Sequence, residues 1–219
     1  MLEAIIFDFD GTVANTIPGI TVGVNLTLQK YGLPTHTEEE MTTYINNGPR
    51  MLIRRSLPRE LQEDEELLER VLKDYNGIYQ SVCKDGSTAY DGILPLLSRL
   101  RERGLRIGIL SNKQDHLLGD LCKNLFGDRI DCTVGTLPDR PAKPDPYLSN
   151  KTVELLGVRA ENCLLIGDSD VDILTAKNVG MHHIGVSWGY RSREFLLQNG
   201  ATEIADTPDI LYSLIEKML

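Results

Sequence analysis

Two aspartates, Asp8 and Asp10, directly follow a short apolar run at residues 5–7 and precede a glycine and a threonine. Such a run is typical of a buried strand, and ligands of open α/β sheets bind just beyond the carboxyl ends of the strands. If the chain stays extended through Phe9, both carboxylates leave the same face. Because two close carboxylates repel each other, they need a cation or a proton. The pattern indicates metal binding, acid/base catalysis or both, with a surface turn as the alternative.

Two later apolar runs and one loop carry further polar residues. The run 105–110 ends at Ser111 and Asn112, the run 163–166 leads to Asp168 and Asp172, and the proline-rich loop 138–146 contains Lys143. If the three strands are neighbours, these groups share one crevice. Their oxygen atoms suit a hard cation such as Mg²⁺, and Mg²⁺ with a lysine beside a nucleophile suits phosphoryl transfer. Each residue alone could be a helix cap or a solvated charge, but their coincidence at three strand ends favours a site.

The two N-terminal aspartates can divide the chemistry of such a transfer between them. Asp8 can act as the nucleophile and form an aspartyl-phosphate that water later cleaves. Asp10 can protonate the leaving oxygen and then deprotonate the attacking water. The sequence therefore predicts a phosphoryl-transfer enzyme that forms a covalent intermediate.

Apolar and helical patterns predict the elements that position these residues. After residue 85 the expected strands and helices alternate, which predicts βαβ units and a mostly parallel sheet. Residues 15–84 instead keep a helical period, with a capping box at Thr37 and Glu40. We therefore expect an α/β core interrupted by an all-helical insertion. The expected strands are residues 5–7, 105–110, 130–134, 163–166 and 183–186, and the expected closing helix is 209–218.

Composition and charge exclude several classes of partner. The 219 residues carry a net charge of −9 and are 41% hydrophobic, as in ordinary soluble globular proteins. A negative surface should repel nucleic acids and anionic membranes. The chain shows neither a signal-peptide pattern nor an apolar run of transmembrane length, and its four cysteines lack zinc-site spacing. We therefore expect a cytoplasmic protein, monomeric or homodimeric, without nucleic-acid or membrane partners.

The motifs in order resemble the four motifs of the haloacid dehalogenase superfamily, in its phosphatase branch. They are Asp8-Phe9-Asp10-Gly11-Thr12, Leu110-Ser111-Asn112, Lys143-Pro144 and Gly167-Asp168-Ser169-x-x-Asp172. The resemblance implies a Rossmann-like doubly wound parallel sheet as the core domain, residues 1–14 and 85–219, with a helical cap domain at residues 15–84. It also implies Asp8 as the nucleophile and Asp10 as the acid/base. Phosphate would be bound by Ser111, Asn112 and Lys143. Mg²⁺ would be held by Asp8, the Asp10 carbonyl and Asp168, with Asp172 as a further ligand or as a support.

Two further stretches, residues 47–53 and 188–192, resemble phosphoglycolate phosphatases of that superfamily. The resemblance makes Gly48 and Arg50 candidates for substrate binding, although Arg50 is equally explained as a solvated charge at a helix start. We expect a Mg²⁺-dependent phosphomonoester hydrolase acting on a small phosphorylated metabolite, with 2-phosphoglycolate as the first candidate. The alternatives are a pyrophosphatase, a nucleotidase or a sugar-phosphate mutase of the same superfamily and, more distantly, a phosphoacceptor signalling module.

Overall fold

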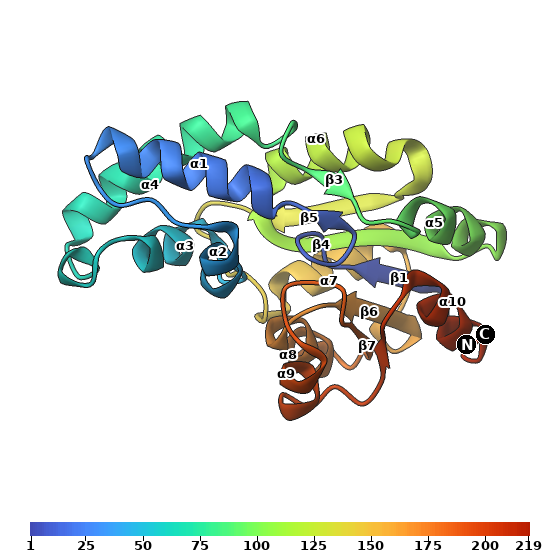
Figure 1. The fold of residues 1–219 in the computed structure, drawn as a ribbon. Coiled ribbons are helices and arrows are strands. Elements are labelled where there is room, and N and C mark those ends of the chain that lie inside the picture. Colours follow the sequence, from blue (N-terminus) through green and yellow to red (C-terminus); the bar gives the residue numbers. More distant parts are fainter. The chain divides into compact units, whose positions relative to one another are not determined.

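The computed structural model describes residues 1–219, which form two compact units (Figure 1). Unit 1 comprises Met1–Asn15 and Ala89–Leu219, and unit 2 comprises Thr16–Thr88. The second boundary lies four residues beyond the expected position, 84. The reason is local, because Gly86 N donates a hydrogen bond to Val82 O and Gly86 O accepts one from Gly19 N, which keeps the chain with unit 2.

Unit 1 is built on a six-stranded sheet in which each neighbouring pair of strands is parallel. In their order across the sheet the strands are β5 (Cys132–Thr136), β4 (Arg106–Gln114), β1 (Ala4–Phe7), β6 (Cys163–Gly167), β7 (His182–Val186) and β8 (Ile204–Ala205). This confirms the predicted α/β fold with a parallel sheet. Strand β8 was not predicted, because two residues are too few to show a periodic pattern. Two short strands, β2 (Ala14–Asn15) and β3 (Thr88–Ala89), form a separate two-stranded sheet.

Helices cover both faces of the sheet (Figure 1). Helices α5 (Ile93–Glu102) and α6 (Asp115–Phe126) pack on one face, and α7 (Pro146–Leu156) and α8 (Asp170–Val179) pack on the other. Alternate strand residues point to each face, so one core cluster joins Ala4, Ile6, Leu110 and Leu165 of the strands to Leu148 and Leu156 of α7. The remaining helices of unit 1 are α9 (Arg193–Gln198) and α10 (Pro208–Glu216).

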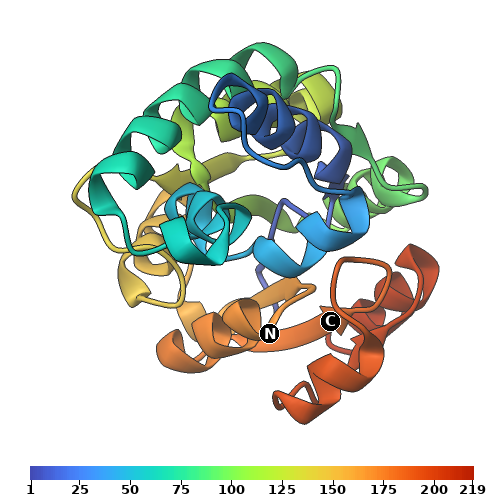
Figure 2. The same ribbon diagram turned by 60° about the vertical axis from the view of Figure 1, so that its left-hand side comes forward.

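Unit 2 is entirely helical apart from its connections. Helices α1 (Ile17–Lys30) and α4 (Glu65–Val82) run side by side in both ribbon views (Figures 1 and 2). Gly23 of α1 allows this, since a Cβ there would lie 3.1 Å from Cδ2 of Tyr79. The apolar stripe of α4 is buried within the unit, at Leu68, Val71, Tyr75 and Tyr79. The unit contains α1 (Ile17–Lys30), α2 (Glu38–Tyr44), α3 (Gly48–Ser56), the 3₁₀ turn η1 (Arg59–Leu61) and α4 (Glu65–Val82). No helix of either unit combines the length and the apolar composition that crossing a membrane requires.

Two local details of unit 2 follow directly from residue type. The predicted capping box is present, because Thr37 Oγ1 accepts from Glu40 N at 3.2 Å while Glu40 Oε2 accepts from Thr37 N at 2.8 Å. At the two ends of the unit, Gly19 N donates to Gly86 O at 3.1 Å, and a Cβ on Gly86 would lie 2.2 Å from Gly19 Cα. Only glycine permits so close an approach of two backbones.

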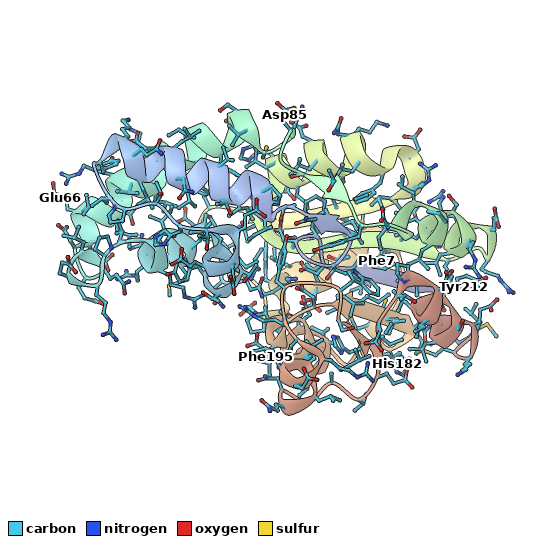
Figure 3. All side chains as sticks on the ribbon, in the orientation of Figure 1. Phe7, Glu66, Asp85, His182, Phe195 and Tyr212 are labelled. Atoms are coloured by element: carbon cyan, nitrogen blue, oxygen red, sulfur yellow. The ribbon has the colours of Figure 1, made fainter.

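Strand β7 carries a pair of histidines with different surroundings. His182, labelled in Figure 3, is exposed, whereas His183 Nε2 is buried and has no hydrogen-bond partner. Burial lowers the pKa of His183 to about 4, against a smaller opposing effect of Asp172. The folded protein therefore holds His183 as the neutral imidazole.

We expect His183 to make stability fall with acidification. Between the ordinary pKa of 6.5 and the folded pKa of about 4, the unfolded chain binds a proton at His183 that the folded chain does not, so the free energy of unfolding decreases as pH falls. The loss attributable to this residue reaches about 3 kcal/mol at pH 4. Urea unfolding of wild type and His183→Leu at several pH values measures the difference in slope. His182→Leu is the matched control, and a wild-type slope in His183→Leu would contradict the assignment.

Candidate active site

The strand ends that carry the predicted site residues lie at one edge of the sheet. Strand β1 lies between β4 and β6, and its register places Phe7 beside Ile109 and Ile166. The backbone continues this pairing, since Asp8 N donates to Ile166 O at 2.8 Å. The structure thus brings together the three strand ends that the sequence could only order along the chain.

Three carboxylates form a buried cluster there. Asp8, Asp168 and Asp172 each present an oxygen, and these oxygens lie within 4.8 Å of one another. Asp8 is 7% exposed, and the other two are fully buried. Carboxylate oxygens so close together, with no His or Cys among them, suit a hard divalent cation. The donor set therefore fits the metal that the sequence predicted.

Lys143 supplies the ammonium of the cluster. Its Nζ lies 2.8 Å from Asp8 Oδ1 and 2.7 Å from Asp172 Oδ1, and it also donates to Leu110 O at 3.1 Å. Burial alone would lower the pKa of Lys143, but Asp172 and Asp8 together raise it above its ordinary value. Lys143 is therefore a fixed positive charge that joins the loop before α7 to β1 and α8.

One ammonium does not balance three carboxylates. Burial raises the pKa of Asp8 to about 7, against the lowering effect of Lys143 and with further increases from Asp172 and Asp10. Burial, followed by Asp8 and Asp172, raises the pKa of Asp168 well above its ordinary value. Without a metal, the folded cluster binds protons more tightly than exposed carboxylates do, and a divalent cation would compete with those protons.

Asp172 holds other parts of the site in place. Its Oδ1 pairs with Lys143, and its Oδ2 accepts from Ser169 Oγ at 2.5 Å and from Ser169 N at 3.2 Å. Both carboxylate oxygens are therefore hydrogen-bonded by protein groups. Through these contacts Asp172 holds Lys143 and the start of α8 in place, and its role as a ligand of the metal or as a support stays a prediction.

Ser111 and Asn112 lie where β4 becomes irregular, between Leu110 and Gln114. Ser111 is 1% exposed, and its Oγ accepts from Lys113 N at 3.2 Å. The Asn112 amide contacts the backbone of Lys143, accepting from its N at 2.8 Å and donating to its O at 3.1 Å. Asn112 thus positions Lys143, and the contact of Asn112 with phosphate stays a prediction.

Comparison with known proteins gives the family of the chain. The model for haloacid dehalogenase-like hydrolases matches residues 5–186, which include every strand end described above. The chain belongs to this family. The resemblance read from the motifs and the prediction of a hydrolase are therefore confirmed.

Full-length relatives agree with the family assignment. A phosphoglycolate phosphatase of Rhodospirillum rubrum is 34% identical over 214 residues, which cover 94% of this chain and 88% of that protein. A phosphoglycolate phosphatase of Colwellia psychrerythraea is 32% identical over 221 residues, covering 97% and 96%. A crystal structure from Lactobacillus delbrueckii subsp. bulgaricus, of a protein inferred to be a phosphoglycolate phosphatase, has a TM-score of 0.91 and 31% identity, covering 97% of this chain and 98% of that one.

Sequence reasoning missed one buried lysine of this hydrolase. Lys113 Nζ lies 3.0 Å from Asp10 Oδ1, with side-chain exposures of 6% and 19%. The two residues are far apart in sequence, so only the adjacency of β1 and β4 reveals the pair. In the sequence, only its position directly after Ser111 and Asn112 indicates that Lys113 belongs to the site.

The loop after β7 supports Asp168 and the first motif of the hydrolase. Tyr190 N donates to Asp168 Oδ2 at 2.7 Å, and Trp188 Nε1 donates to Thr12 O at 2.9 Å. Gly189 permits this packing, since a Cβ there would lie 2.4 Å from both Asp168 Cβ and Gly11 O. The sequence resemblance singled out this stretch, but the contacts depend on tertiary structure.

The two predicted residues of unit 2 lie at the start of α3. Gly48 adopts a φ of +78°, which favours glycine. The Arg50 guanidinium pairs with Glu65 and Glu69 of α4. The Arg50 side chain is 43% exposed, and both of its ion pairs lie within unit 2. Its contact with substrate stays a prediction.

Proposed function

We propose that this hydrolase cleaves small phosphomonoesters through an aspartyl-phosphate on Asp8. One observation carries the proposal: Lys143 joins Asp8 to Asp172 within a buried carboxylate cluster that fits a hard divalent cation. The arrangement places a nucleophile beside a fixed positive charge, as charge neutralisation in phosphoryl transfer requires.

The residues divide the reaction into two steps. Asp8 attacks phosphorus while Asp10 gives a proton to the leaving alcohol oxygen, and Asp10 then takes a proton from the water that cleaves the phosphoaspartate. Ser111 Oγ, the Asn112 backbone and Lys143 bind the phosphoryl oxygens. Mg²⁺, bound by Asp8, the Asp10 carbonyl and Asp168, would supply further neutralisation of the phosphoryl charge.

We propose 2-phosphoglycolate as the substrate. Full-length relatives at 34% and 32% identity bear the name phosphoglycolate phosphatase, which supports this choice. We assign to unit 2, residues 16–88, the cap role that the resemblance implies.

Phosphate release from a substrate panel tests the function. The panel contains 2-phosphoglycolate, pyrophosphate, a hexose phosphate and a nucleoside monophosphate, each with Mg²⁺ or with excess EDTA. We expect release to depend on Mg²⁺ and to be fastest with 2-phosphoglycolate. Release from another compound alone would overturn the substrate, and conversion without phosphate release would indicate a mutase. No turnover of any compound would overturn the hydrolytic function.

A further inference from the structure

The second lysine of the site is held in place as firmly as the first. Lys113 lies in the irregular part of β4, and its Nζ lies 3.0 Å from Asp10 Oδ1 and 5.7 Å from the centre of the Phe9 ring. The side chain is only 6% exposed, so the ammonium is confined beside the end of β1. Its position is therefore a property of the folded core and not of a mobile surface chain.

The two lysines serve different carboxylates. Lys143 pairs with Asp8 and Asp172, whereas Lys113 pairs with Asp10. A buried ion pair contributes little net stability, because desolvation of both charges offsets their attraction. The stability of the fold alone therefore gives little reason for a lysine beside Asp10. A better reason is that Lys113 interacts with the group that approaches Asp10 during the reaction.

That group is the alcohol of the substrate. In the proposed mechanism Asp10 protonates the leaving oxygen, so this oxygen must come within hydrogen-bond distance of the carboxylate. Lys113, in contact with Asp10, then lies on the leaving-group side of the reaction, and Lys143, in contact with Asp8, lies on the phosphoryl side. An ammonium has three N–H donors and can hold Asp10 and a second acceptor together.

We propose that Lys113 binds a carboxylate on the leaving alcohol and so selects phosphomonoesters of short hydroxy acids. In glycolate a single carbon separates the carboxylate from the leaving oxygen, which brings an acid within reach of a cation beside Asp10. The inference rests on the proposed function. It names the residue that distinguishes a leaving alcohol that carries a carboxylate from one that is uncharged. Arg50 is the rival for this task, although its guanidinium already pairs with two carboxylates of α4.

The test compares two substrates of equal carbon number, 2-phosphoglycolate and ethyl phosphate. We expect wild type to prefer phosphoglycolate, and Lys113→Met to lower kcat/KM for phosphoglycolate about 100-fold more than for ethyl phosphate, as the loss of a charged hydrogen bond predicts. Lys113→Arg keeps the charge and should retain most of the preference. Lys123→Met removes a surface lysine of the same unit, paired with Asp128, and should leave both substrates unchanged.

Each alternative outcome overturns a different statement. An equal loss with both substrates would show that Lys113 only positions Asp10, and loss of the preference in Arg50→Met but not in Lys113→Met would move the role to Arg50. A wild type that hydrolyses both esters equally well would remove the inference but keep the phosphatase. A wild type that hydrolyses neither would remove the proposed function itself. If Lys113→Met melts below assay temperature, Lys113→Gln gives the same comparison with a polar side chain of similar length.

Discussion

Replacing Asp8 with asparagine should reduce phosphate release at least about 10³-fold, because a carboxamide cannot attack phosphorus. The fold should survive, since the amide fills the same volume and still offers an oxygen to Lys143, 2.8 Å from Oδ1 in wild type. Steady-state kinetics with 2-phosphoglycolate and Mg²⁺ measure the loss, and circular dichroism measures the fold.

Two companion variants separate chemistry from charge at Asp8. Asp8→Glu keeps the carboxylate but moves it by one methylene, so it should also lose activity if alignment with phosphorus is required. Asp120→Asn makes the same change of charge at an exposed position of α6 and should behave as wild type. Turnover near the wild-type rate in Asp8→Asn would exclude Asp8 as the nucleophile.

Replacing Asp168 with asparagine should abolish stabilisation by Mg²⁺. In wild type, Mg²⁺ at about 100 times its dissociation constant should add about 2.7 kcal/mol to the free energy of unfolding, or roughly 5–10 °C in melting temperature. Burial raises the pKa of Asp168 in the folded chain, so Asp168 destabilises the metal-free fold once pH exceeds the ordinary pKa of an aspartate. The metal-free variant should therefore melt at or above the wild-type temperature at pH 8 while having almost no activity.

Differential scanning fluorimetry with MgCl₂ measures both effects, and NaCl of equal ionic strength is the control. Because protons compete with the metal for Asp8 and Asp168, the wild-type shift should grow as pH rises from 6 to 8. An equal Mg²⁺-induced shift in Asp168→Asn and wild type would place the metal elsewhere.

Strands and helices with a strong local pattern were predictable from the sequence. The expected strand 163–166 is β6 (Cys163–Gly167), and the helical period expected over residues 15–84 includes α4 (Glu65–Val82). The expected strand 105–110 instead runs on as β4 to Gln114, past a register shift. Pairing with β5 extends that strand to Gln114. Strand pairing depends on tertiary structure, so the spacing of hydrophobic residues does not predict it.

The site was predictable as a set of strand ends but not as a set of contacts. Asp8, Asp168 and Lys143 were predicted because polar residues coincide at several strand ends and in one loop, although each residue alone has another explanation. The Asn112 amide forms hydrogen bonds with the Lys143 backbone, and Lys113 forms an ion pair with Asp10. Both contacts join residues on different elements, so no pattern of spacing in the sequence predicts them. Asn112 shows the limit most clearly. The family resemblance implied that it binds phosphate, whereas the structure shows that its side-chain amide bonds to the backbone of Lys143.

The contact between Gly19 and Gly86 has a consequence for how the chain can vary in length. The inserted segment returns to its starting point, so the 66 residues between the two glycines form a closed loop whose ends are fixed by each other. Closing a longer or shorter loop costs little additional entropy. We therefore expect that the helices between these two positions can be lengthened, removed or exchanged while the strand ends that carry Asp8 and Asp168 keep their register.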